Sequence, residues 1–130
     1  VLMDLPSRNL SLMPNGLGYV HKALKKTSLH FQTIDCDIIL YHRFHCHRLL
    51  DVGGPVMSPR GTPFPDDPWS AEDMSLWDGD EMVAYFESDI NEIVNALLAA
   101  KPAMLGLSIQ QCNLRFAREV VQRVKSVCQT

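Results

Sequence analysis

Three histidines and one cysteine are crowded into a single short segment, as His42, His45, Cys46 and His47. On a helix, His42 shares a face with His45 and Cys46, because residues three and four apart are neighbours there. Imidazole nitrogen and thiolate sulfur are ligands that Zn²⁺ prefers. A metal site formed by His42, His45 and Cys46 is therefore one hypothesis. No fourth ligand is obvious, and a helix that exposes its imidazoles to solvent or to a partner domain explains the same pattern, so we predict no bound metal.

Other catalytic signatures are missing from the sequence. Gly16-Leu17-Gly18 lacks the third glycine of a dinucleotide-binding loop, and Val52-Gly53-Gly54-Pro55 lacks the strand and helix that flank a phosphate-binding loop. Ser108 lies in no Gly-x-Ser-x-Gly elbow and has no assignable base. It also begins a Ser-Ile-Gln sequence where a response-regulator receiver would carry its phospho-acceptor aspartate. Phosphate-loop nucleotide chemistry, serine hydrolysis and phosphotransfer are therefore not expected.

Composition predicts one soluble globular domain over residues 1–130. The chain has 130 residues, 46% of them hydrophobic and 21% charged, which is enough to bury a substantial core. A net charge of −3 without a basic run gives no support for nucleic-acid binding, and no signal peptide or membrane-length apolar stretch is present. We therefore expect a cytoplasmic protein without a membrane span. Its four widely spaced cysteines are expected to be reduced.

The pattern over residues 86–128 predicts a helix, a strand and a second helix. Asp89 and Glu92 resemble an acidic helix start, and apolar residues follow them at helical spacing. Residues 103–109 form an apolar run too short for a helix, as in a parallel strand covered on both faces, so we predict a central strand there. Apolar residues return at helical spacing over residues 117–127. Such a succession is typical of a doubly wound α/β sheet.

The amino-terminal part predicts a strand over residues 1–6, a helix over 14–26 and a second strand over 29–35. The loop after the first strand then lies at the carboxyl edge of the sheet, where open α/β sheets bind ligands. The fold prediction is a three-layer, Rossmann-like (flavodoxin-like) α/β domain with a parallel sheet of order 2-1-3. It is truncated, because the fourth and fifth strands are missing, and we expect the chain to be a fragment of a longer protein.

A helix is weakly favoured over residues 37–50, and a proline- and glycine-rich insertion follows over 52–80. The insertion holds five of the eight prolines and four of the seven glycines. Loops of this length are lids, partner-binding segments or disordered linkers, and the aromatic residues Phe64, Trp69 and Trp77 predict that part of it packs down. Residues 61–100 carry ten carboxylates and no lysine or arginine, which predicts a solvated acidic face.

The order of several motifs resembles the amino-terminal cobalamin (B12)-binding-type domain of B12-dependent radical SAM enzymes. In that family a first strand ends in a proline-containing loop, a helix begins with a Pro-x-x-Leu-Gly-like segment, and a second strand closes on an aspartate. A Pro-x-hydrophobic-x-Gly-hydrophobic-Ser strand and an amphipathic helix follow. The matching segments, outside residues 36–81, are Leu5-Pro6-Ser7, Pro14 to Tyr19, Ile34-Asp35, Pro102 to Ser108 and Ala117 to Lys125.

The resemblance implies a platform that positions a corrinoid for chemistry carried out with a downstream radical SAM domain, the chain itself being non-catalytic. The implied cofactor contacts come from two carboxyl-edge loops and are Pro6, Ser7, Arg8, Leu12, Ser108, Gln110, Gln111 and Asn113. The Asp-x-His-x-x-Gly signature is absent, so cobalamin would have no lower histidine ligand from that motif. The Cys-x-x-x-Cys-x-x-Cys motif is also absent, so SAM and the iron-sulfur cluster would belong to the rest of the parent protein.

Two alternatives stay open at this stage. Ser108, Gln110 and Asn113 would also be explained as caps of strand and helix ends, and Asn113 is well placed as an N-cap. The domain would then be a degenerate Rossmann-like module without a cofactor, with the Trp69 and Trp77 insertion as its protein-contact surface. A His/Cys metal-binding domain is the third and weakest interpretation.

Overall fold

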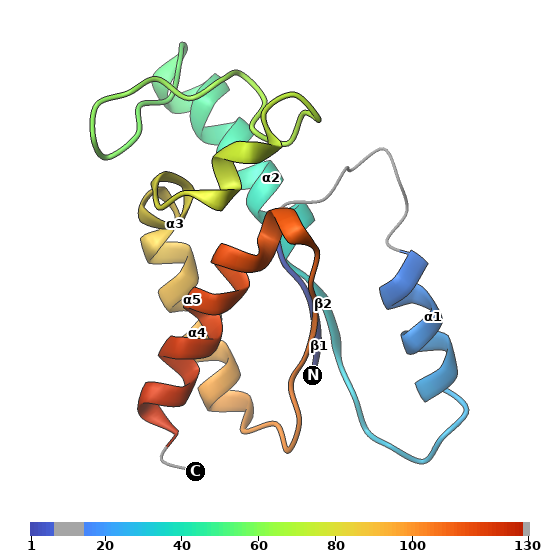
Figure 1. Ribbon diagram of the computed structural model, residues 1–130. Coiled ribbons are helices and arrows are strands. Elements are labelled where there is room, and N and C mark those ends of the chain that lie inside the picture. Colours follow the sequence, from blue (N-terminus) through green and yellow to red (C-terminus); the bar gives the residue numbers. More distant parts are fainter. Residues whose placement is uncertain (7–14, 129–130) are drawn as a thin grey trace.

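The computed structural model describes residues 1–6 and 15–128 (Figure 1). In these residues, five α-helices and three strands are accompanied by the π-helix η1 and the 3₁₀ helices η2 and η3. The element order is β1 (Leu2–Asp4), α1 (Asn15–Leu24), β2 (Thr33–Asp35), α2 (Cys36–Cys46), η1 (His47–Val52), η2 (Met74–Asp78), α3 (Glu81–Tyr85), α4 (Glu87–Ala100), β3 (Gly106–Ser108), η3 (Gln111–Asn113) and α5 (Leu114–Val127). In these two ranges no helix has the length and apolar character needed to cross a membrane.

The three described strands form one parallel sheet in which β1 lies between β2 and β3. Met3 of β1 is aligned with Ile34 of β2 on one side and with Leu107 of β3 on the other. Parallel neighbours need long crossover connections, which α1 supplies between β1 and β2 and the segment from α2 to α4 supplies between β2 and β3. The predicted α/β class and the strand order 2-1-3 are confirmed.

The prediction of a central strand over residues 103–109 is wrong. Only Gly106–Ser108 pair as a strand, at the margin of the described sheet, and β1 takes the central position. Met104 precedes the strand and is 79% exposed. Leu105 and Leu107 pack against the hydrophobic core. An apolar run therefore shows that a strand contacts the core, but does not show whether its outer edge is paired.

Helices cover both faces of the sheet (Figure 1). On one face, α4 and α5 lie together and bury apolar residues such as Ile90 and Phe116 in the same cluster as Met3 and Leu5. On the other face lies α1, in which Leu17 is the one buried residue between positions 16 and 24. The main core of the described chain is therefore on the α4 and α5 side.

The start of α4 differs from the prediction. The helix begins at Glu87, two residues before Asp89, and no side chain caps its first turn. Asp89 and Glu92 accept hydrogen bonds from Arg43 of α2 instead. An acidic pair that resembles a helix cap is thus used to join two helices.

The insertion packs onto the core, as its aromatic residues predicted. Phe64, Trp69 and Trp77 are between 1% and 5% exposed. The indole N–H of Trp69 donates to Asp37 at 2.7 Å, and that of Trp77 donates to the Pro68 carbonyl at 2.8 Å. Buried indoles are expected to find such partners. Both tryptophans are core residues, so the expectation that they form a protein-contact surface is wrong.

Arginines from outside the acidic stretch 61–100 neutralise much of its charge. The paired carboxylates are Asp66 with Arg48, Asp80 with Arg115, Glu81 with Arg60, Glu87 with Arg123, and Asp89 and Glu92 with Arg43. The predicted solvated acidic face is therefore corrected to a surface of ion pairs that join the insertion and α4 to their neighbours.

Candidate functional site at the carboxyl edge of the sheet

The carboxyl ends of β1 and β3 lie side by side, and the helices that follow them lie on opposite faces of the sheet. β1 is followed by α1 on one face, and β3 is followed by α5 on the other (Figure 1). This arrangement is a topological switch point, and open α/β sheets bind ligands in the crevice outside the strand ends at such a point. The edge formed by β1 and β3 is therefore the candidate site.

Asn113 joins the two strand ends. The side chain is fully buried, and its amide nitrogen donates to the carbonyls of Leu5 at 3.1 Å and Ser108 at 3.2 Å. Its Oδ1 accepts a hydrogen bond from the N–H of Gln110 at 2.8 Å. Both amide hydrogens are thus used by main-chain carbonyls. These bonds give Asn113 a structural role at this edge. Asn113 occupies the N-cap position of α5 as predicted, but its side chain makes no capping hydrogen bond to that helix.

The structure brings other predicted contact residues to the same edge. Ser108 is half-buried at the end of β3, and Gln110 and Gln111 are exposed in the turn that follows. Pro6, just after β1, is buried. The hydroxyl and the two amide groups can both donate and accept hydrogen bonds. The remaining three predicted contacts, Ser7, Arg8 and Leu12, lie outside the described residues.

A row of polar residues crosses the sheet at this edge, which was not predicted from the sequence. Asp4 is aligned with Asp35 of β2 and with Ser108 of β3, and residues aligned in this way point to the same face. Asp4 is 1% exposed, and Asp35 accepts a hydrogen bond from the N–H of Ile38 at 3.0 Å. A signal was available, because each predicted strand carries a polar residue near its carboxyl end, but only the register shows that the three residues are neighbours.

The cysteine beside this row is not activated. Cys36 follows β2 directly and is 3% exposed. Burial, together with the nearby carboxylates of Asp35 and Asp4, raises the pKa of Cys36 to about 12. Because only the thiolate is a good nucleophile or metal ligand, this cysteine is a structural thiol at neutral pH.

The histidine-rich segment is helical, as predicted, and forms α2 and the start of η1. His47 shares a 2.7 Å hydrogen bond with the hydroxyl of Tyr85, and His45 Nε2 lies 3.4 Å from a carboxylate oxygen of Asp67. His42 and Cys46 are exposed. Within residues 1–6 and 15–128, no three His, Cys, Asp or Glu side chains are grouped so that they could hold a metal ion. The metal-site hypothesis for His42, His45 and Cys46 therefore gains no support.

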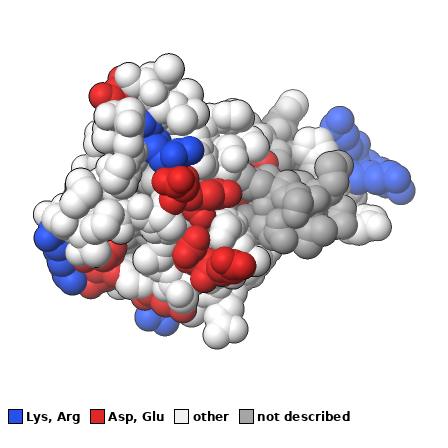
Figure 2. Space-filling view, turned by 90° about the horizontal axis from the view of Figure 1, so that it is seen from above, with Lys and Arg blue, Asp and Glu red and all other residues white. Residues whose placement is uncertain are grey.

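The surface around the edge carries acidic side chains. Figure 2 views the molecule from the carboxyl edge and shows carboxylates gathered in the middle of this face, with one basic group directly against them and another apart at the α1 side. Like charges repel a polyanionic ligand and lower its local concentration. Ion pairs with arginines reduce this effect, so the charge of the surface does not by itself select a ligand class.

Comparison of the chain with protein-family models, with curated proteins and with solved structures returned no match. The resemblance to cobalamin-binding-type domains therefore stays a prediction, which depends on the order of motifs along the chain. The α/β class and the strand order are properties of the structure and do not depend on that resemblance.

Proposed function

We propose that the chain is a cobalamin-binding-type domain, which holds a corrinoid at the carboxyl edge of its sheet and positions it for chemistry carried out with a downstream radical SAM domain. The observation that carries the proposal is the switch point between β1 and β3, with Ser108, Gln110 and Gln111 at its rim. The cofactor would supply the reactive chemistry and the protein its binding and orientation. On this proposal the chain alone does not catalyse a reaction.

The residues at the edge fit such a group. A corrinoid carries amide side chains around its ring, and the hydroxyl of Ser108 and the amide of Gln111 can donate hydrogen bonds to them and accept hydrogen bonds from them. The Gln110 side-chain oxygen already accepts from the main-chain N–H of Asn113, so Gln110 would contribute its amide N–H groups. Asn113 would contribute indirectly, by holding the β1 and β3 ends in place. The Asp-x-His-x-x-Gly signature is absent, so these contacts and packing would replace a histidine bond to the lower face of cobalt.

Absorbance spectroscopy tests the proposal after the chain is mixed with hydroxocobalamin and desalted. The wild-type chain is expected to retain a corrinoid spectrum. Ser108→Tyr places a bulky ring at the strand end and is expected to weaken binding by about tenfold or more. Ser88→Tyr makes the same exchange at an exposed position of α4 and should leave binding unchanged. A wild-type chain that is folded by circular dichroism yet retains no corrinoid would refute the proposal.

A protein-interaction module is the second candidate, and the exposed apolar residues of η1 favour it. Leu49 and Leu50 are 63% and 80% exposed, and no residue of η1 is buried. Exposed apolar patches mark interaction sites, and π-helical turns are frequent at functional sites. This candidate predicts a folded chain that retains no corrinoid and that self-associates or binds a partner through η1. Leu50→Ser should then weaken that association, as measured by sedimentation velocity.

A further inference from the structure

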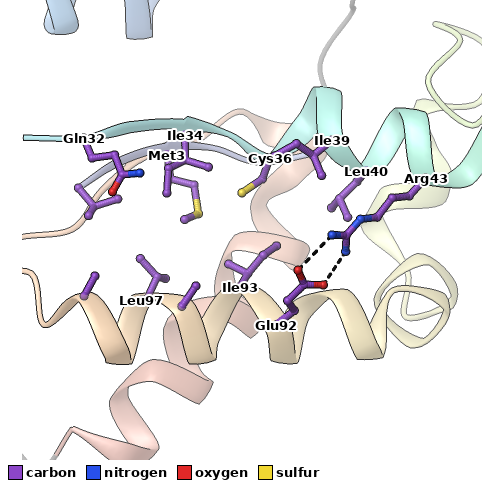
Figure 3. Close-up of a pocket in the computed structure, with 13 residues that line it drawn as sticks. Met3, Gln32, Ile34, Cys36, Ile39, Leu40, Arg43, Glu92, Ile93 and Leu97 are labelled. Atoms are coloured by element: carbon purple, nitrogen blue, oxygen red, sulfur yellow. Dashed lines mark hydrogen bonds and ion pairs between the residues drawn. The ribbon is translucent and has the colours of Figure 1, made fainter.

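A cavity of about 210 Å³ lies between the sheet and α4, on the face of the sheet opposite Asp4 and Ser108 (Figure 3). The strands contribute one wall, and α2 and α4 contribute the others. The residues that carry the argument are Met3, Cys36, Leu40, Arg43, Ala96 and Leu97. None of the described residues predicted to contact a corrinoid lines this cavity. It is therefore a second candidate site, independent of the proposed function.

The floor of the cavity is apolar and its residues are little exposed, and its rim is open to solvent. Met3, Cys36, Leu40 and Leu97 are each between 1% and 3% exposed. Ala96 is exposed at the rim. Apolar cavities of about 150 Å³ in proteins stay dry and accept benzene. A molecule of one-ring size would therefore fit here and gain free energy by leaving water.

The charged groups at the mouth are already paired with one another. Arg43 donates to both carboxylate oxygens of Glu92, at 2.8 and 3.1 Å, and also to Asp89. These hydrogen bonds hold the pKa of Glu92 below its usual value, so the pair is charged at neutral pH. An anionic ligand would have to displace Glu92 from Arg43. An uncharged ligand leaves the pairs intact, which favours it.

Three of the lining groups favour an aromatic ring over an aliphatic one. The sulfur atoms of Met3 and Cys36 point into the gap between the sheet and α4, and Arg43 lies at one end of it (Figure 3). Thioether and thiol sulfur make favourable contacts with ring edges, and guanidinium groups stack on ring faces. We propose that this cavity is a binding site for a small, uncharged, monocyclic aromatic molecule.

Methyl chemical shifts of the full chain, recorded by NMR, test this proposal with three probes. Toluene is expected to shift the methyl signals of Ile34, Ile93 and Leu97 in a saturable manner, because these residues line the cavity. Methylcyclohexane, which has a similar shape, is expected to bind about threefold more weakly or worse, because it lacks the sulfur–aromatic contacts. Benzoate is expected to bind more weakly still.

A matched pair of variants decides where toluene binds. Ala96→Leu fills the cavity from α4 and should abolish the saturable shifts, whereas Ala99→Leu adds the same side chain at an exposed position of α4 outside the cavity and should leave them unchanged. Both exchanges keep a good helix former, so both variants should fold. The proposal is overturned if wild type shows no saturable shift, if Ala96→Leu binds toluene as wild type does, or if methylcyclohexane binds as tightly as toluene. Corrinoid retention plays no part in these outcomes.

Discussion

The two faces of the sheet differ in how they are covered. On the α4 and α5 side, Met3, Leu5 and Phe116 are at most 1% exposed and share one core cluster. The α1 side carries the polar residues Thr33, Asp4 and Ser108, and Thr33 shares a 2.7 Å hydrogen bond with His21 of α1. Apart from the cavity between the sheet and α4, the first face is packed and stabilises the fold, whereas the second face places polar groups beside the switch point. We infer that the main hydrophobic core and the polar residues beside the switch point lie on opposite faces of the sheet.

The largest expected change in stability comes from replacing a leucine by alanine, and its size should differ between the two faces of the sheet. Leu5→Ala, on the α4 and α5 side, should lower the free energy of unfolding by about 2–5 kcal/mol because it leaves a cavity in the packed core. Leu17→Ala in α1 should cost less than half as much, since the surroundings of α1 are more open. Urea unfolding followed by circular dichroism measures both values. Equal losses in the free energy of unfolding would show that the two faces are equally well packed, which would contradict the difference described above.

An intermediate effect is expected at the strand ends. Asn113→Ala leaves the carbonyls of Leu5 and Ser108 and the N–H of Gln110 without their present partner, and should destabilise the chain by about 2–3 kcal/mol. Asn95→Ala, at an exposed position of α4, is the control and should change stability by about 0.5 kcal/mol or less. Chemical denaturation measures the difference. Equal stability of the two variants would contradict the role of Asn113 in joining β1 to β3.

A smaller effect is expected in the insertion. Trp69→Phe keeps most of the buried ring but removes the N–H that donates to Asp37, and should cost about 1–3 kcal/mol. Trp fluorescence during urea unfolding measures this cost, with the remaining Trp77 as the probe. A variant as stable as wild type would show that packing alone, and not this hydrogen bond, holds the insertion on α2.

The smallest effect concerns the outer surface of α5. Hydrogen bonds from Arg115 and Arg123 lower the pKa of Glu119 in the folded state. A carboxylate with a lowered pKa stabilises the fold above its unfolded pKa of about 4.3, and this stabilisation is lost as the pH falls through the folded pKa. Glu119→Gln should therefore remove at most about 1 kcal/mol at pH 7 and flatten the acid limb of the stability curve.

Urea titrations between pH 7 and pH 3 measure this dependence. Glu72→Gln removes an exposed carboxylate of the insertion and is the control, which should follow the wild-type curve. An unchanged acid limb in Glu119→Gln would show that its two arginine partners do not stabilise the fold in solution.

Much of the fold could be predicted because its signals are local. The apolar spacing over α4 and α5 and the short strand between them are set by neighbouring residues, and the confirmed order 2-1-3 follows from alternating strands and helices with right-handed crossovers. Strand ends were less predictable, since the predicted strand over 29–35 pairs only over Thr33–Asp35. Pairing depends on the neighbouring strand, which local sequence does not contain.

The candidate site could be predicted only in part. Topology indicates that Pro6 and Ser108 come to one edge, but not that Asn113 uses its amide to join carbonyls of Leu5 and Ser108. Nothing in the sequence indicates the cavity between the sheet and α4, because its walls come from segments far apart in the chain.

The sequence by itself determined α1, α2, α4 and α5, the parallel class of the sheet and the burial of the insertion's aromatic residues, because periodicity and hydrophobicity act over short distances. It did not indicate α3, η2 or η3. Tertiary structure alone decided that Arg43 joins Asp89 and Glu92, that Asp4 lies between Asp35 and Ser108, and that β3 lies at the sheet margin. Each of these features depends on which distant segments become neighbours. Many residues in the chain could pair with a given carboxylate or strand edge, so residue type alone does not identify the partner.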